Sequence, residues 1–158
     1  NFDELDPQPL KAIKYYEKAI EFGHIKAYYH YGRLLQMGNE PELKKNLQKS
    51  FKILMLGVRN GDDECLIAAA DVAFALGSKE KSITLAKKYL TSQGFNRKDR
   101  HISSLLWYLS NLHWKDLTYY KLLLPSISPY KHEFLNYFED ESIDQTLYKD
   151  FHFALLDL

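Results

Sequence analysis

The chain contains a single cysteine and no surplus of either charge. Cys65 has no partner for an internal disulfide, and its apolar helical surroundings predict a small buried side chain rather than a reactive thiol. Lys and Arg number 21 and Asp and Glu number 21, so the formal net charge is zero. A neutral chain lacks the positive field on which non-specific nucleic-acid binding depends. We therefore expect no nucleic-acid partner, and cysteine usage leaves the compartment open.

Long apolar runs are also missing. The most apolar stretches, near residues 65–77 and 102–114, fall short of the ~18–20 residues that span a bilayer. We therefore expect no direct insertion into a membrane. Because the chain begins at Asn1, the absence of a signal peptide carries no weight, and we expect a piece of a longer chain or of a complex.

The patterns of catalytic and metal sites are sparse. Six histidines are present, and none pairs with another at the i, i+3 or i, i+4 spacing of a helical metal site. His132-Glu133 matches the beginning of a zinc-protease signature, but Asn136 stands where the second histidine would be. Phosphate-binding glycine loops and Gly-x-Ser-x-Gly turns are absent, and the acidic run 139–141 is typical of a solvated loop. We expect no catalytic residue, no metal and no cofactor.

Apolar and aromatic residues recur at helical spacing along the whole chain, and no segment alternates with a period of two. The pattern predicts an all-α protein. The expected helices cover residues 10–22, 27–37, 47–58, 65–76, 79–93, 102–112, 117–124 and 134–138, and a last one begins at Ser142. The residues expected at their ends are Gly23, Gly61, Gly77 and Gly94 as C-terminal glycines, Asn46 and Ser78 as N-caps, and Pro125 as a helix stop.

Two stretches of the sequence repeat each other 38 positions apart. Small residues at fixed spacing mark points where helices approach closely, and a period of this length is typical of stacked helix pairs. The residues expected to form this packing are Ala12, Tyr16, Ala19, Gly23, Ala27, Gly32, Gly61, Cys65 and Ala70. A third unit follows after only 32 positions, from Ser50 to Ser82.

The segment 11–38 contains Lys-Ala, Tyr-Tyr, Lys-Ala and Gly-His pairs and closes on Gly38. It resembles the suppressor-enhancer-of-lin type (SEL-like) repeat, a relative of the tetratricopeptide repeats (TPR). The resemblance covers residues 10–77 and weakens towards residue 114. It implies a right-handed α-α superhelix (solenoid) of antiparallel helix pairs, with degenerate repeats in residues 1–114 and a C-terminal helical cap of the same domain in residues 115–158. Ser50 and Ser82 depart from the pattern, in which alanine occupies this position.

The resemblance also implies a function. In arrays of this type the first helix of each pair lines the concave side, so we expect a non-enzymatic adaptor or scaffold that binds a peptide or protein segment in its groove. The candidate partner-binding residues are His24, Tyr28, Tyr31, Asp62 and Leu66. Exposed apolar surface is expected along the row of first helices. Two alternatives stay open: an immunity-type or regulatory protein that blocks a partner protein, and an enzyme with an unrecognised site in residues 115–158.

Overall fold

The computed structural model describes residues 8–92, 99–112, 121–139 and 149–158. Helices make up most of these segments, and no β-strand forms within them, although an isolated β-bridge joins Asn39 and Leu43. The elements are α1 (Pro9–Glu21), α2 (Lys26–Met37), α3 (Leu47–Arg59), α4 (Glu64–Ala75), α5 (Lys79–Thr91), α6 (Asp99–Leu112), α8 (Leu124–Ile127), the 3₁₀ helix η2 (Ser128–Tyr130), α9 (Lys131–Phe138) and α10 (Lys149–Leu156). The prediction of an all-α protein is confirmed.

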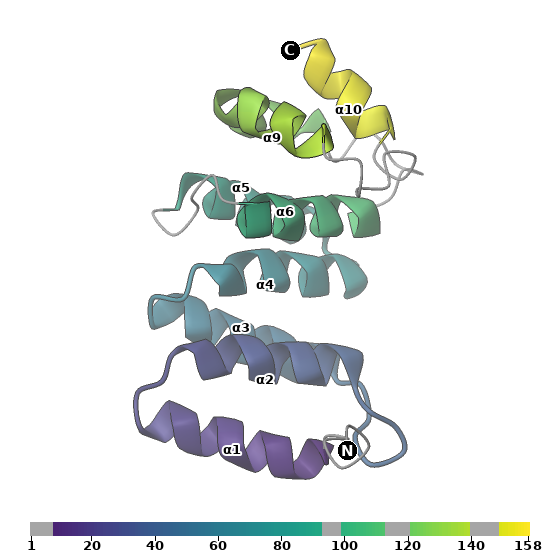
Figure 1. The fold of residues 1–158 in the computed structure, drawn as a ribbon. Helices are drawn as coiled ribbons and strands as arrows, with labels where there is room; N and C mark the ends of the chain where they lie inside the picture. Colours follow the sequence, from purple (N-terminus) through teal and green to yellow (C-terminus); the bar gives the residue numbers. More distant parts are fainter. Residues whose placement is uncertain (1–7, 93–98, 113–120, 140–148) are drawn as a thin grey trace.

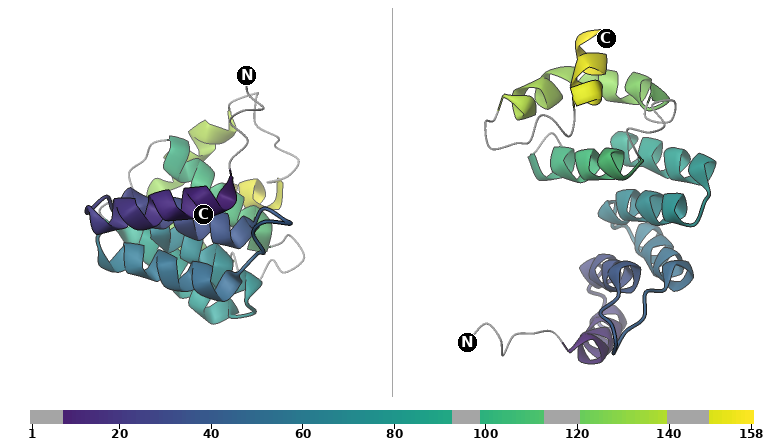
Figure 2. Two further views of the ribbon diagram at one scale, coloured as in Figure 1. Left: turned by 90° about the horizontal axis from the view of Figure 1, so that it is seen from below. Right: turned by 90° about the vertical axis from the view of Figure 1, so that its right-hand side faces the viewer.

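The helices follow one another in chain order from one end of the molecule to the other, with α5 and α6 at the same level and with α1 and α10 at opposite ends (Figures 1 and 2). From α1 to α5 each helix contacts the next one along the chain, and α4 also contacts α2 and α6. Every residue of α4 from Cys65 to Ala73 is buried, including Asp71. The sequence predicted one apolar face for this helix. It is buried on all sides because neighbours cover it from several directions.

Three helices end in the same way. The residue after each helix-terminal glycine donates its amide N–H to a carbonyl five residues earlier: His24 to Ala19, Asp62 to Gly57, and Ser78 to Ala73. Gly23, Gly61 and Gly77 have φ angles of +84°, +98° and +91°, which side chains larger than glycine's disfavour. The three predicted C-terminal glycines are therefore confirmed, and Gly94 lies outside the described residues.

The N-terminal ends of the helices differ from one another in how they are capped. Pro9 starts α1, where its missing N–H costs no hydrogen bond. Asn46 caps α3, because its side-chain oxygen accepts a hydrogen bond from the Lys49 amide at 3.0 Å. Ser78 stands at the N-cap position of α5, but its side chain makes no capping hydrogen bond. Both predicted cap positions are correct, but only Asn46 caps its helix through its side chain.

The helix bounds repeat along the chain. Both ends of α3 lie 38 positions after those of α1, and both ends of α4 lie 38 positions after those of α2. Both ends of α5 lie 32 positions after those of α3. The six-residue difference comes from the connections, because residues 38–46 join α2 to α3 whereas residues 76–78 join α4 to α5.

The C-terminal segments pack against α5 and α6. Helix α8 contacts α5, and α9 contacts α6 and α10. Phe134, Phe138, Phe151 and Leu155 are buried there. Pro125 does not simply stop a helix, since it occupies the first turn of α8. The helix predicted from Ser142 is described from Lys149 onwards, and residues 140–148 lie outside the described residues.

Candidate protein-binding groove

Helices α3 and α5 line a groove of about 600 Å³ on the surface of the molecule. Its lining residues are Phe51, Lys52, Met55, Leu56 and Arg59 of α3, and Lys81, Thr84, Leu85 and Lys88 of α5. The two helices contribute apolar side chains at the centre of this set. Phe51 and Met55 are half-buried, Leu85 is buried, and Leu56 remains 39% exposed.

Helical spacing explains why these side chains share a face. The α3 residues fall at intervals of three and four, as neighbours on one side of a helix do. The adjacent side of α3 is used for packing, because Ser50, Leu54 and Gly57 are buried. In α5 the buried positions Ser82, Ala86 and Tyr89 play the same part. Each helix therefore packs with one side and presents the other to the groove.

The charged side chains that line the groove are all positive. Lys52, Arg59, Lys81 and Lys88 line it, and no carboxylate of the described residues does. Across the described residues, no ion pair joins any of these four cations to a carboxylate. The Lys81 Nζ atom lies 5.4 Å from the centre of the Phe51 ring, so this pair connects the two walls of the groove.

The five candidate partner-binding residues lie elsewhere. His24 is exposed in the turn before α2, and Tyr28 is half-buried on α2. Tyr31, Asp62 and Leu66 are only 3%, 3% and 5% exposed, so each presents little surface to a partner. Tyr28 lies close to the turn that leads to Asp62, since the Asn60 side chain donates a hydrogen bond to the Tyr28 hydroxyl at 3.4 Å. None of the five lines the α3–α5 groove.

Asp62 and Cys65 form a small polar cluster at the beginning of α4. The Asp62 Oδ1 atom lies 3.3 Å from the Lys26 Nζ atom and accepts a hydrogen bond from the Glu64 amide. Burial, and then the negative charge of Asp62, raise the pKa of the Cys65 thiol well above its usual range. Because the thiol stays protonated near neutral pH and is fully buried, it packs as a small hydrophobic side chain. The predicted burial of Cys65 is confirmed.

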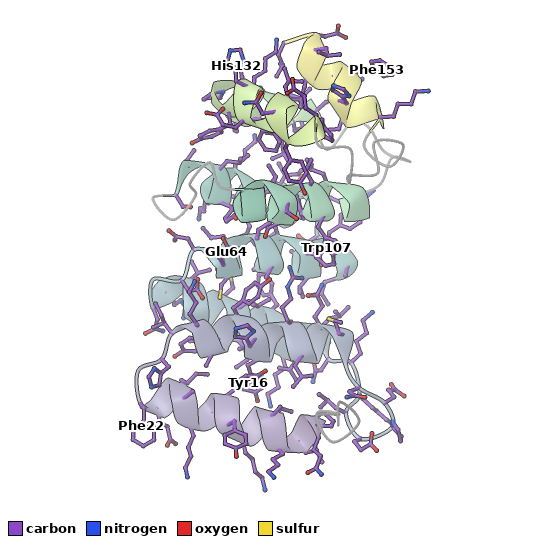
Figure 3. The ribbon with its side chains drawn as sticks, in the orientation of Figure 1. Tyr16, Phe22, Glu64, Trp107, His132 and Phe153 are labelled. Carbon is purple, nitrogen blue, oxygen red and sulfur yellow. The ribbon has the colours of Figure 1, made fainter. Side chains whose placement is uncertain are left out.

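The predicted packing residues occupy several kinds of position. Cys65 and Ala70 are fully buried, and Ala27 is nearly so. Gly32 is also buried, and an added Cβ atom there would collide with the Leu54 side chain. Ala12, Tyr16 and Ala19 of α1 are only half-buried, and Figure 3 shows Tyr16 between α1 and α2. The rings of Tyr16 and Tyr31 stack with their centres 6.3 Å apart.

A polar network that was not predicted from the sequence joins α2, α4 and α6. Arg33 donates a hydrogen bond to Gln36 at 2.8 Å and pairs with Asp71 at 3.5 Å, and Gln36 donates to Asp71. The Arg33 guanidinium also lies 4.5 Å from the ring centre of Trp107, which Figure 3 places beside α4. The signal in the sequence is Asp71, a single charge within the apolar run 65–73. Burial of that carboxylate requires partners.

A second hollow of about 410 Å³ lies beside this network, between α2 and α6. Its lining includes Tyr29, Met37 and Trp107, together with Arg33, Ser103 and Ser104. The positive charge of Arg33 is already matched by Asp71. Met37 and Trp107 are exposed in this hollow, but its described lining lacks the row of unpaired cations that lines the α3–α5 groove.

Searches for other sites among the described residues find neither a group of three potential metal ligands nor a helix long and apolar enough to cross a membrane. Of the acidic run 139–141, Glu139 is described and exposed, and the other two residues lie outside the described part. Comparison of the chain with models of protein families, with curated proteins and with solved structures finds no match. The α3–α5 groove is therefore the feature of the molecule that points to a function.

Proposed function

We propose that this protein is a non-enzymatic adaptor that holds a segment of a partner protein in the α3–α5 groove. The observation that carries the proposal is the apolar centre of that groove, formed by Phe51, Met55, Leu56 and Leu85. Apolar side chains in a concave surface with polar groups at its edge are typical of sites that receive a peptide. Leu56 is exposed, and a bound side chain would remove it from water.

The proposal includes the arrangement of the helices. We propose that α1 to α6 form antiparallel pairs of a right-handed superhelix of SEL-like repeats, capped by the C-terminal helices. The offsets of 38 and 32 positions between helix bounds support this arrangement. In it, α3 and α5 are the first helices of consecutive pairs, so the groove lies along the row of first helices.

A pair of equivalent hydrogen bonds supports the same arrangement. The Ser50 hydroxyl donates to the Gly32 carbonyl at 2.6 Å, and the Ser82 hydroxyl donates to the Ala70 carbonyl at 2.7 Å. The two serines lie 32 positions apart, and the two acceptors lie 38 positions apart. Each bond therefore joins a first helix to the second helix of the preceding pair.

Selection from a displayed library of random peptides tests the binding role of the groove. Peptides selected on the wild-type protein are measured against Leu56→Glu and against Leu76→Glu. Leu76 is a matched control, because it is 40% exposed and lies outside the groove lining. Glutamate at position 56 removes apolar surface from the centre of the groove, and a bound apolar side chain would have to desolvate the new charge. We therefore expect Leu56→Glu to weaken selected peptides about 10-fold or more and Leu76→Glu to leave them unchanged. If Leu56→Glu alters none of the selected peptides, the groove is not the binding site.

A further inference from the structure

We propose that the segment held in the α3–α5 groove is acidic and amphipathic, with large apolar side chains flanked by Asp or Glu. This inference rests on the proposed function and adds the chemistry of the partner. The groove lining contains four cations and no carboxylate, although the chain as a whole carries equal numbers of the two charges. Positive charge is therefore concentrated at the groove, and a partner of complementary charge is favoured there.

The cations form two rows. Lys52 and Arg59 are seven residues apart on α3, and Lys81 and Lys88 are seven residues apart on α5. Seven residues of helix cover about two turns, or about 10 Å. Between the members of each row lie the apolar side chains, Met55 and Leu56 on α3 and Leu85 on α5. A matching ligand inserts apolar side chains between the rows and places a carboxylate near either end of each row.

The apolar floor favours a polypeptide over other polyanions. A nucleic-acid backbone presents phosphates but has no apolar side chain to bury against Met55 and Leu56. Stacking of a base requires an open aromatic face, and the Phe51 ring is half-buried with Lys81 near its face. An acidic peptide satisfies both the charges and the floor of the groove.

The experiment compares two variants with the same change in net charge. The groove variant carries Lys52→Glu, Arg59→Glu, Lys81→Glu and Lys88→Glu. The control variant carries Lys11→Glu, Lys14→Glu, Lys44→Glu and Lys45→Glu, at exposed lysines outside the groove lining. A third variant, with glutamine at the four groove positions, removes the cations without adding repulsion, and circular dichroism verifies that each variant keeps its helices.

The probes are the library peptides whose binding depends on Leu56. We expect their sequences to be enriched in Asp and Glu around two large apolar residues. Exposed ion pairs are individually weak and are screened by salt. Four of them together should nevertheless change Kd about 10-fold at low salt. The glutamine variant should bind about 10-fold more weakly, and the groove variant more weakly still because it adds repulsion. The control should change less than about 2-fold, and added salt should weaken the wild type towards the glutamine variant.

The outcomes separate the two proposals. If Leu56-dependent peptides are found but are neutral or basic, or if the glutamine variant binds them as well as the wild type, the charge inference is wrong and the adaptor proposal stands. If no peptide depends on Leu56, the adaptor proposal itself fails. Single-stranded oligonucleotides and phosphatidylserine vesicles are measured in parallel. Tighter binding of either one than of the selected peptides, lost in the groove variant, also overturns the inference.

Discussion

Gly32 and Leu54 form a close contact between α2 and α3. The glycine has no side chain, and the fully buried Leu54 fills the space that a Cβ atom would need. The corresponding positions between α4 and α5, which lie 38 and 32 residues later, are Ala70 and Ala86. Both alanines are fully buried. One interface therefore combines a glycine with a leucine, and the other combines two alanines.

This difference predicts a strong coupling between the two positions. Gly32→Ala should lower the free energy of unfolding by about 1–2 kcal/mol, because overpacking outweighs the higher helix propensity of alanine. Leu54→Ala alone should lower it by about 2–5 kcal/mol through a cavity. The double variant recreates the alanine pair, so its loss should be smaller than the sum by about 1 kcal/mol or more. Urea unfolding of the four proteins measures the coupling, and additive losses would show that Gly32 and Leu54 do not compete for the same space.

The hydrogen bonds of Ser50 and Ser82 could not be predicted from the residue type alone. From the sequence, Ser50 and Ser82 are departures from a pattern that has alanine at this place. In the structure each hydroxyl bonds to a carbonyl of the preceding helix, and Ser82 also shares a hydrogen bond with the buried Tyr108 hydroxyl at 2.6 Å. Burial raises the pKa of Tyr108 above its usual range. The acceptors lie on other helices, so sequence spacing within one helix could not reveal them.

At the scale of the helix, the capping residues of α3 and α5 differ. Asn46 bonds to the Lys49 amide, whereas the Ser78 side chain bonds to no amide of α5. Asn46→Ala should therefore lower the free energy of unfolding by about 1 kcal/mol. Ser78→Ala should lower it by less than about 0.5 kcal/mol. Thermal or urea unfolding compares them, and an equal loss for the two variants would contradict the assignment of the caps.

Helix positions follow largely from the sequence, because apolar spacing and terminal glycines act locally. The bounds of α1 to α4 agree closely with the predicted ranges, and Gly38 follows α2 as expected. What the pattern could not show is how much of each helix is covered. Helix α4 is buried on all sides, and α1 leaves Tyr15 and Phe22 exposed, with Phe22 pointing away from the molecule at the end of α1 (Figure 3). The burial of a helix depends on which other helices pack against it, and that depends on the fold of the whole chain.

At the scale of the whole molecule, we expect stability to fall from α4 towards α1. Helix α4 contacts four other helices, whereas the inward residues Ala12, Tyr16 and Ala19 of α1 are only half-buried. Amides in α4 should exchange with solvent about 100-fold more slowly than those in α1, since local opening needs less energy where fewer apolar contacts are lost. Hydrogen exchange followed by mass spectrometry measures both helices in one experiment. Equal protection of α1 and α4 would mean that the molecule opens only as a unit.

The α3–α5 groove depends on the arrangement of the whole molecule. Its cations are visible in the sequence as two pairs with a spacing of seven, Lys52 with Arg59 and Lys81 with Lys88. Their meeting across one groove depends on the placement of α3 and α5, and both helices pack against α4. The resemblance instead points to residues from two consecutive units, at α2 and at the beginning of α4, and three of them are buried.

The connections between helix pairs differ in length, and this affects how repeats can be recognised in a sequence. Nine residues join α2 to α3 and three residues join α4 to α5, while α1, α3 and α5 each contain 13 residues. The connections vary in length whereas these helices do not. A search for repeats at a fixed interval of 38 residues therefore misplaces the third unit. Related chains are better aligned by the glycines that follow α1 and α3, Gly23 and Gly61, and by the Ser50 and Ser82 hydroxyls, which bond α3 and α5 to the preceding helix.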